Sequence, residues 1–217
     1  MTFDLFDAVD DAAPAVEPLA DGAMVLRGLA WPAQDALLAD VRAVIAAAPL
    51  RHPITPGGRC MSVAMTSCGA LGWVSDRRGY RYDPNDPERR APWPAMPASF
   101  VRLAAQAASR AGFDGFLPDA CLINRYEPGA RLSLHQDRDE RDFGAPIVSV
   151  SLGLPAVFLF GGLSRADKAT RIQLRHGDVV VWGGPSRLRF HGVLSLADGD
   201  HALLGRQRIN LTLRRAG

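Results

Sequence analysis

Eight short β-rich runs follow one another after Pro118 with no helical segment between them. Turn residues such as Pro128-Gly129 and Gly177-Asp178 separate the runs. Strands joined by short turns pair in antiparallel sheets, whereas parallel pairing needs long crossover connections. Residues 119–217 are therefore expected to form a two-sheet jelly roll. The predicted strands are Cys121–Tyr126, Leu132–His135, Ile147–Leu152, Val157–Phe160, Arg171–Leu174, Val179–Trp182, Leu188–Val193 and Arg208–Leu213.

The first half of the chain contains two helical patterns, so the predicted fold is mainly β with flanking helices. Over residues 33–48 the apolar residues recur at the spacing of one helix face, and Pro49 ends the helix. A second helix is predicted over residues 98–111, with Gly112 as its C-terminal stop.

Three other segments of the first half lack a helical pattern. Residues 1–25 are an acidic arm, which is expected to be irregular over residues 1–22. Residues 50–97 are rich in glycine, proline, aromatic residues and arginine, which indicates loops and short strands around Met61–Met65 and Tyr80–Tyr82.

Length and composition indicate one domain with a full core, because the chain has 217 residues of which 47% are hydrophobic. No apolar stretch reaches about 18 residues, so no membrane span is expected. The N-terminus is acidic and lacks an apolar segment, which argues against a secretory signal and favours the cytoplasm. Cys60, Cys68 and Cys121 are widely spaced, which predicts free thiols rather than disulfides or a zinc site.

Charge is distributed unevenly, although the net charge is only +2. Residues 1–50 contain two arginines and eight acidic residues, a balance of −6, so the remainder carries +8. Lys168 is the only lysine, and arginine pairs bidentately with phosphate or carboxylate. The charge alone is weak support for a nucleic-acid partner.

The run His135-Gln136-Asp137 is a candidate metal-binding motif. On a β-strand, residues i and i+2 point to the same face, so His135 and Asp137 can direct ligand atoms at one point. Two histidines and one carboxylate form the facial triad of non-haem Fe(II) oxygenases, which leaves positions open for a cosubstrate and dioxygen. Alone, His-x-Asp is a weak signal, because a hydrogen-bonded histidine near acidic residues is commoner than a metal site.

Three later histidines are candidates for the third ligand. His176 lies in a His-Gly-Asp turn, and His201 lies in a polar loop. His191 lies in a strand-like run, where a side chain can be held rigidly inward. We therefore prefer His191 as the partner of His135 and Asp137.

The C-terminal run from Arg208 to Arg214 predicts a strand with one polar and one apolar face. Arginine, asparagine and threonine alternate with Ile209, Leu211 and Leu213. The two terminal arginines are separated by about 20 Å of strand, at about 3.3 Å per residue, and their side chains can converge on a small dicarboxylate. The alternative is an exposed edge strand. Asn124-Arg125-Tyr126 ends another predicted strand and offers an amide and a phenol to the same pocket.

The most specific patterns in the chain are the runs Leu122–Gly129, Leu132–Asp137, Pro146–Gly153, Gly177–Gly184, Arg187–Gly192 and Arg208–Arg214, together with Met61–Met65, Gly72-Trp73 and Gly79–Tyr82 upstream. These runs resemble the AlkB family of alkylated-nucleic-acid repair dioxygenases. The similarity covers residues 50–217, whereas residues 1–25 carry little of it. It implies a double-stranded β-helix, or jelly roll, with a nucleotide-recognition lid built from N-terminal elements, which we place with the helical support in residues 26–118.

The resemblance also implies roles for individual residues. His135, Asp137 and His191 would bind Fe(II). Arg208 would pair with the distal carboxylate of 2-oxoglutarate, and Arg214 would lie near the end that chelates iron. The full 2-oxoglutarate set is Asn124, Arg125, Tyr126, Arg208, Asn210 and Arg214. The substrate-contacting set is Trp73, Tyr80, Arg81, Tyr82, Asp139 and Arg165.

The implied reaction is oxidative demethylation of 1-methyladenine and 3-methylcytosine, with O2 as the second cosubstrate. Hydroxylation of the N-methyl group gives a hemiaminal that releases formaldehyde, and 2-oxoglutarate becomes succinate and CO2. These bases are cationic, so an aromatic face such as Trp73 and the carboxylate of Asp139 suit them. The expected partners are single- or double-stranded alkylated DNA and also RNA, with the base out of the stack. The protein is expected to act as a monomer, with no membrane partner.

Two alternatives remain open from the sequence. One is a 2-oxoglutarate hydroxylase that acts on protein or on a small molecule. The other is a catalytically inactive jelly roll that only binds nucleic acid. Succinate production separates the enzyme from the binder, and formaldehyde release from methylated oligonucleotides separates the two enzymes.

Overall fold

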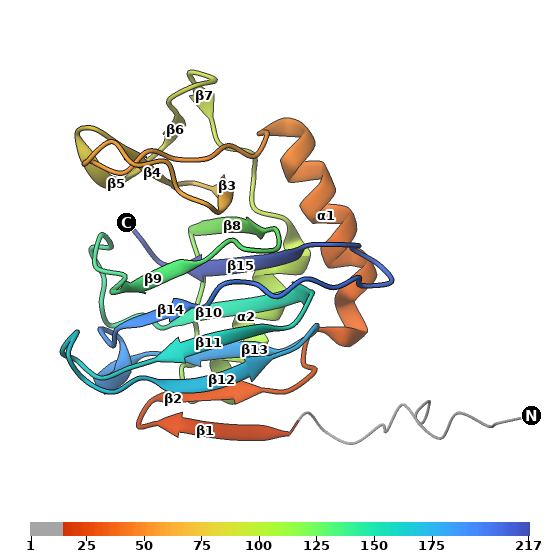
Figure 1. The fold of residues 1–217 in the computed structure, drawn as a ribbon, viewed down its shortest axis with the longest axis vertical. Coiled ribbons are helices and arrows are strands. Elements are labelled where there is room, and N and C mark those ends of the chain that lie inside the picture. The colour runs from red at the N-terminus through yellow and green to blue at the C-terminus, as the bar shows by residue number, and fades with distance from the viewer. Residues whose placement is uncertain (1–14) are drawn as a thin grey trace, which may run out of the picture.

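The computed structural model describes residues 15–217, which fold around two antiparallel sheets packed face to face (Figure 1). The larger sheet has the strand order β1-β2-β13-β10-β15-β8-β3, and the smaller has the order β12-β11-β14-β9. The larger sheet consists of β1 (Val16–Ala20), β2 (Ala23–Leu26), β3 (Ala64–Gly69), β8 (Ala120–Tyr126), β10 (Ile147–Gly153), β13 (Val179–Trp182) and β15 (Arg208–Arg214). The smaller consists of β9 (Leu132–His135), β11 (Ala156–Phe160), β12 (Thr170–Leu174) and β14 (His191–Val193).

The eight strands from β8 to β15 are divided equally between the sheets, and this arrangement is a jelly roll. Four of them, β8, β10, β13 and β15, are neighbours in the larger sheet, and the other four make up the smaller sheet. The predicted fold class is therefore confirmed. All eight predicted strands of this half are present, although several begin or end a few residues away from the predicted bounds.

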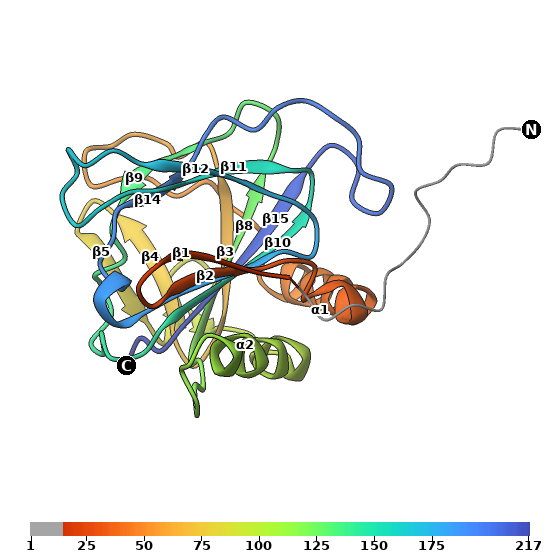
Figure 2. The ribbon, with the colours of Figure 1, turned by 90° about the horizontal axis from the view of Figure 1, so that it is seen from below.

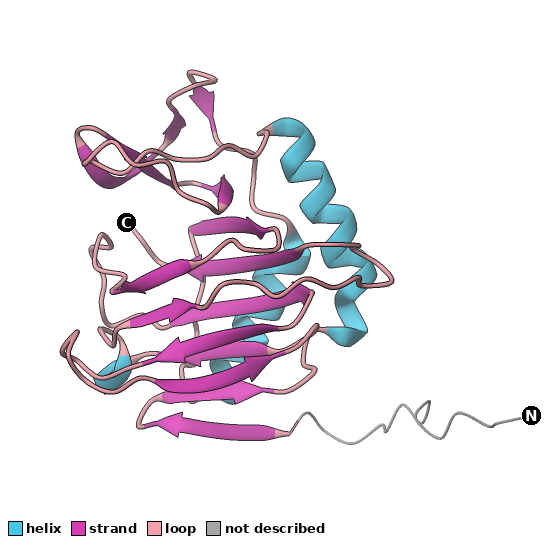
Figure 3. Ribbon diagram, in the orientation of Figure 1, coloured by secondary structure: helices cyan, strands magenta, loops and turns pink. Residues whose placement is uncertain are grey.

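Two helices, α1 (Gln34–Ala47) and α2 (Ala98–Arg110), cover the outer face of the larger sheet (Figures 2 and 3). Their apolar faces are buried because they pack on that sheet. Leu37 of α1 and Phe100 of α2 are fully buried in one cluster with Ile123 and Leu211 of the sheet. The helices leave the inner face of the sheet free to face the smaller sheet, where a second core forms around Tyr126 and Trp182.

Strand β15 lies in the middle of the larger sheet, between β10 and β8, and all seven of its residues are buried. Because side chains alternate along a strand, Ile209, Leu211 and Leu213 join the core under the helices. Arg208, Asn210, Thr212 and Arg214 point to the space between the sheets instead. The edge-strand alternative is therefore wrong.

Two small hairpins lie near the β3 end of the larger sheet (Figure 1). One pairs β4 (Gly72–Asp76) with β5 (Gly79–Asp83), and the other pairs β6 (Asn85–Asp86) with β7 (Ala91–Pro92). In the first hairpin Trp73 lies directly opposite Tyr82. Their side chains therefore share one face of the hairpin.

Three local predictions were wrong. The acidic arm was expected to be irregular, but residues 16–20 form β1, because β2 offers an edge on which they pair in an antiparallel register. The strand expected at Met61–Met65 begins at Ala64 instead, as β3. The run expected from Leu188 is a strand only from His191, since a 3-10 turn at Gly184–Ser186 (η2) holds Arg189 through its backbone N–H. Residues 1–14 of the arm lie outside the described residues.

A 3-10 turn at Trp31–Ala33 (η1) leads directly into α1. Among the residues that the structure describes, no helix is long and apolar enough to cross a membrane.

The carboxylate of Asp178 joins the N-terminal strands to the jelly roll. Its Oδ1 accepts from the backbone N–H of Gly28 at 3.0 Å, and its Oδ2 accepts from Arg27 Nη1 at 2.7 Å and from the backbone N–H of Arg175 at 2.9 Å. The side chain is almost completely buried. These bonds attach the segment after β2 to the turn between β12 and β13.

We expect Asp178→Ala to lower the free energy of unfolding by about 1–3 kcal/mol, because three partly buried donors, one of them charged, lose their common acceptor. Asp198→Ala is the matched control, since Asp198 pairs with Arg206 where both side chains are about two-thirds exposed. Its loss should be about 1 kcal/mol or less. Urea unfolding of both variants tests this, and equal losses would contradict the assigned role of Asp178.

Candidate active site

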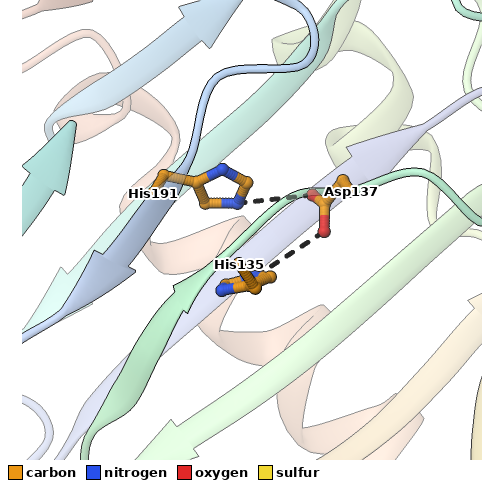
Figure 4. A group of neighbouring side chains, drawn as sticks. All are labelled: His135, Asp137 and His191. Carbon is orange, nitrogen blue, oxygen red and sulfur yellow. Dashed lines mark ion pairs between the residues drawn. The ribbon is translucent and has the colours of Figure 1, made fainter. Parts of the chain in front are cut away.

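His135, Asp137 and His191 come together at one end of the space between the sheets (Figure 4). His135 ends β9, His191 begins β14, and the two are cross-strand partners, which brings their ring centroids to 4.4 Å. Asp137 follows β9 and lies with Oδ1 3.7 Å from His135 Nε2 and Oδ2 3.6 Å from His191 Nε2. One ligand atom from each of the three lies within 4.8 Å of the others.

The two imidazoles are held in the tautomer that a metal needs. The Nδ1 of His135 lies 2.8 Å from the carbonyl of Ser133, and that of His191 lies 3.1 Å from the carbonyl of Arg189. A carbonyl only accepts, so each Nδ1 carries a hydrogen, and each Nε2 faces Asp137. Burial and the neighbouring His191 lower the pKa of His135 to about 4, so its ring is neutral at pH 7.

Asp137 is an anion held by Arg214. Burial alone would raise the pKa of the Asp137 carboxyl, but Arg214, followed by His191, outweighs it and keeps the pKa well below the usual range. Arg214 donates to Oδ2 from Nε at 3.0 Å and from Nη2 at 2.6 Å. The site therefore offers two imidazoles and one carboxylate, the donor set of a facial iron triad.

The space between the sheets is a cavity of about 930 Å³ with the three ligand residues in its wall. Strand β15 contributes its polar face, and β9 and β14 contribute the opposite wall. Other residues in the wall come from both sheets, from the β4–β5 hairpin and from the loops after β9 and β11: Met65, Trp73, Tyr80, Leu122, Asn124, Tyr126, Asp139, Ser149, Phe158, Arg165, Trp182, Arg208 and Asn210.

Arg208 lies in the cavity wall with only 1% of its surface exposed. Its Nη2 donates to Ser151 Oγ at 2.9 Å, and its guanidinium lies 5.0 Å from the centre of the Tyr126 ring. Its Nε and Nη1 have no hydrogen-bond partner within residues 15–217. Two buried donors on a fixed cation suit a carboxylate, because an unpaired buried donor is costly.

The amides beside Arg208 form a connected polar layer. Asn124 Nδ2 donates to Asn210 Oδ1 at 3.3 Å, and Asn210 Nδ2 donates to Ser149 Oγ at 2.8 Å. The hydroxyl of Thr212 also donates to Asn210 Oδ1, at 3.0 Å. Asn124 Oδ1 has no partner among the described residues. This layer lies between Arg208 and Arg214 on the polar face of β15.

The mouth of the cavity carries an aromatic pair and a carboxylate. Trp73 and Tyr80 stack with their centroids 5.5 Å apart and 15° between their planes. The indole Nε1 of Trp73 donates to Asp139 Oδ2 at 3.0 Å. Arg165 lies in the same wall and donates from Nη1 to the carbonyl of Leu134 at 2.6 Å, with its guanidinium 5.0 Å from the Phe190 ring.

Three residues of the predicted sets lie away from the cavity wall. Arg125 alternates with Asn124 and Tyr126 along β8, so its side chain points to the other face of the sheet and pairs with Glu127 at 3.4 Å. Arg81 lies on the other face of its hairpin from Tyr80 and bonds to Asp76 at 3.0 Å. Tyr82 donates its hydroxyl to Glu140 Oε1 at 2.8 Å.

The structure also places residues at the site that the sequence did not indicate. Glu140 is a buried carboxylate 3.2 Å from Arg214, and Arg187 donates to the backbone carbonyl of Asp137 at 2.7 Å. Ser149 and Ser151 bond Asn210 and Arg208. The serines had a readable signal, since they alternate with apolar residues in β10. The acidic run that contains Glu140 has no pattern that separates a buried carboxylate from a solvated one.

These observations fit a bound Fe(II) and a bound dicarboxylate. The triad offers one ligand atom from each of three residues, and Arg208, on β15 in the wall of the same cavity, offers unpaired buried donors. A jelly roll with this pair of sites is an oxygenase that couples iron to a 2-oxo acid. In agreement, the family model of the 2OG-Fe(II) oxygenase superfamily matches residues 22–214.

The relatives narrow the class further. The chain is 57% identical over 213 residues to the alpha-ketoglutarate-dependent dioxygenase AlkB of Escherichia coli strain K12, with 98% of this chain and 99% of that protein covered. It is 45% identical over 213 residues to the AlkB homolog of Caulobacter vibrioides strain NA1000, with 94% and 95% covered. The solved structure of OsALKBH1 superposes with a TM-score of 0.82 at 28% identity, covering 93% of this chain and all of that one.

The chain therefore belongs to the AlkB family of the 2OG-Fe(II) oxygenases. It is a 2-oxoglutarate-dependent dioxygenase with Fe(II) as its metal. The expectation of an iron- and 2-oxoglutarate-dependent enzyme is confirmed, and so is the predicted family.

We expect Asp137→Ala to weaken binding of Mn(II), used as a redox-stable probe for Fe(II), by more than about 100-fold. Loss of a residue that only supports a metal ligand typically weakens binding by about 10- to 100-fold, so loss of a ligand should exceed that range. The variant loses the only anionic ligand of the triad. His201→Ala is the control, because His201 lies in a different loop and stacks on His176 at 4.6 Å. Calorimetric titration measures both, and near-normal binding by Asp137→Ala would remove Asp137 from the metal site.

Proposed function

We propose that this enzyme oxidatively demethylates alkylated bases, with 1-methyladenine and 3-methylcytosine in DNA as its main substrates and RNA as a further one. The observation that carries the proposal is the Trp73–Tyr80 stack with the Asp139 carboxylate, all in the wall of the cavity that holds the triad. An aromatic face and an anion together recognise a flat, cationic ring.

The names of the relatives support the same substrate class. A homologue in Arabidopsis thaliana that is 35% identical over 185 residues is named a DNA N(6)-methyladenine demethylase. A mouse homologue that is 36% identical over 124 residues is named a nucleic acid dioxygenase. The chain spans less than half of those two proteins, 41% and 31%, so their names support the chemistry and not the details of the substrate.

His135, Asp137 and His191 would hold Fe(II), and Arg208 would hold the distal carboxylate of 2-oxoglutarate. Bound together with O2, the metal and cosubstrate supply the oxidation that hydroxylates an N-methyl group, after which formaldehyde leaves the base. Asn124, Tyr126 and Asn210 shape the pocket between the two ends of the cosubstrate. Arg214 keeps Asp137 ionised and oriented, because its Nε and Nη2 both donate to Asp137 Oδ2.

Trp73 would stack on the flipped base, with Tyr80 beside it, while Asp139 attracts its positive charge. Asp139 is already oriented by the indole N–H of Trp73 through Oδ2. Its other oxygen remains available to an amino group of the base. Arg165, next to the mouth of the cavity, is suited to a backbone phosphate.

The β4–β5 hairpin and the segment before it would form the nucleotide-recognition lid, within a supporting unit of residues 26–118 that covers the jelly-roll core of residues 119–217. The proposed functional unit is a monomer. The three free cysteines are compatible with the cytoplasm, where thiols stay reduced.

The proposal is tested by formaldehyde release from oligonucleotides that carry 1-methyladenine or 3-methylcytosine, in DNA and RNA, in single and double strands. Release that depends on both Fe(II) and 2-oxoglutarate is the expected result. Succinate formation with a peptide or small-molecule acceptor, without release from any oligonucleotide, would instead favour the hydroxylase alternative.

We expect Arg208→Ala to raise the half-saturating concentration of 2-oxoglutarate at least tenfold. The charge-assisted bonds to a carboxylate contribute about 1.5–3 kcal/mol, and tenfold corresponds to about 1.4 kcal/mol. Arg171→Ala, which removes an exposed arginine of β12, is the control. Succinate formation as a function of 2-oxoglutarate measures the effect, and an unchanged half-saturation would exclude Arg208 from the pocket.

We expect Trp73→Ala to weaken demethylation through substrate binding, since a base–aromatic stack contributes about 1–3 kcal/mol. Decarboxylation of 2-oxoglutarate without substrate should persist, because the residues of the metal and cosubstrate sites are unchanged. Asp139→Ala should reduce turnover of cationic lesions more than of neutral ones. Equal loss of both activities in Trp73→Ala would show that the indole is needed for the fold of the site instead.

A further inference from the structure

Glu140 is a buried carboxylate three residues beyond Asp137, and its side chain is only 1% exposed. Two arginines and one tyrosine surround it. Its Oε1 accepts from the Tyr82 hydroxyl at 2.8 Å and lies 3.2 Å from Arg214 Nε, and its Oε2 lies 3.1 Å from Arg187 Nη2. A buried carboxylate with this many partners has a fixed position.

Both arginines that contact Glu140 also hold Asp137. Arg214 binds the Asp137 side chain through two donors, and Arg187 donates to its backbone carbonyl at 2.7 Å. Glu140 thus supports the side chain and the main chain of Asp137 at the same time. The reach of Arg187 is itself fixed, since it also donates from Nε to the carbonyl of Ala145 at 3.1 Å.

The negative charge of Glu140 balances the buried positive charge next to Asp137. Arg214 and Arg187 are almost completely buried, with side-chain exposures of 6% and 3%. Asp137 alone would leave one of these two cations uncompensated beside a site for a divalent cation. Since buried like charges repel strongly, the second carboxylate makes the neighbourhood favourable for a metal.

The same cluster is attached to the lid hairpin. Trp73 and Tyr82 face each other across β4 and β5, and they bond the adjacent residues Asp139 and Glu140. One cross-strand pair therefore holds two consecutive residues of the segment that carries Asp137. The Trp73 bond holds Asp139 at the proposed base pocket. The Tyr82 bond holds Glu140, which contacts the two arginines that bind Asp137.

We propose that Glu140 is a positioning residue for Asp137, and that Tyr82 couples it to the β4–β5 hairpin. Metal binding and the ordering of the hairpin are then linked. This proposal rests on the role of Asp137 as a metal ligand given above. Linkage is reciprocal, so if the hairpin position affects the metal site, metal binding must order the hairpin by the same free energy.

The first test measures metal affinity with the full-length protein. Glu140→Gln keeps the size of the side chain and its acceptor for Tyr82 but removes the charge, so Mn(II) should bind at least fivefold more weakly. Asp142→Asn is the matched control, because that carboxylate lies two residues away and pairs with Arg215 where both side chains are well exposed. An affinity within twofold of wild type for Glu140→Gln would overturn the positioning role.

The second test reads the link to the hairpin through amide hydrogen exchange of residues 72–83, with and without Mn(II). Metal should slow this exchange in wild type and in Asp142→Asn. In Tyr82→Phe, which loses only a hydroxyl, the metal-dependent slowing should fall by at least half, while Mn(II) affinity stays measurable. Equal slowing in wild type and Tyr82→Phe would overturn the coupling.

The Asp137→Ala variant distinguishes a failure of the metal assignment from a failure of the coupling to the hairpin. If Asp137→Ala binds Mn(II) as wild type does, the metal assignment itself fails. If it loses metal while Tyr82→Phe keeps wild-type slowing, the assignment stands and only the coupling fails. Should Glu140→Gln prove unstable in thermal unfolding, Tyr82→Phe still decides the link, since its side chain loses one oxygen and keeps its ring.

Discussion

The buried ion pair between Arg214 and Asp137 joins the two sheets at the point where the metal site forms. Arg214 ends β15, an interior strand of the larger sheet, and Asp137 follows a strand of the smaller one. The pair compensates two buried charges, since a buried ion without a partner costs several kcal/mol. The jelly roll therefore closes with these two residues together, and the cavity exists because β15 presents polar side chains where a sandwich core would have apolar ones.

The two faces of β15 have different roles. On one side, Ile209, Leu211 and Leu213 pack under α1 and α2 and make the sheet rigid. On the other, Arg208 and Asn210 hold a polar layer whose hydrogen bonds run to Ser149 and Ser151 of β10. A strand fixed on its apolar face can keep its polar groups in place without water, and such preorganisation is what a site for a small dicarboxylate needs.

Much of this architecture could be predicted from the sequence, because a strand alternation is a local property. The faces of β15 followed from a period-two pattern, the preference for His191 followed from its place in a strand-like run, and the jelly roll followed from the succession of short strands. Pairings between segments that are far apart in the chain are harder to predict from local sequence patterns. No local pattern shows that residues 16–20 add an edge strand or that Glu140 is buried among Arg187, Arg214 and Tyr82. The outward direction of Arg125, by contrast, follows from the alternation with Asn124 and Tyr126 along β8 and was readable from the sequence.

The unpaired donors of Arg208 have a consequence for the choice of cosubstrate. A 2-oxo acid with a second carboxylate satisfies the buried guanidinium, whereas one that ends in a methyl or an alkyl group leaves its Nε and Nη1 without an acceptor. Sites that are built to bond a polar group discriminate strongly against analogues that lack it. With the proposed role of Arg208, discrimination against short keto acids such as pyruvate would be a property of β15 itself and would operate before any nucleic acid reaches the enzyme.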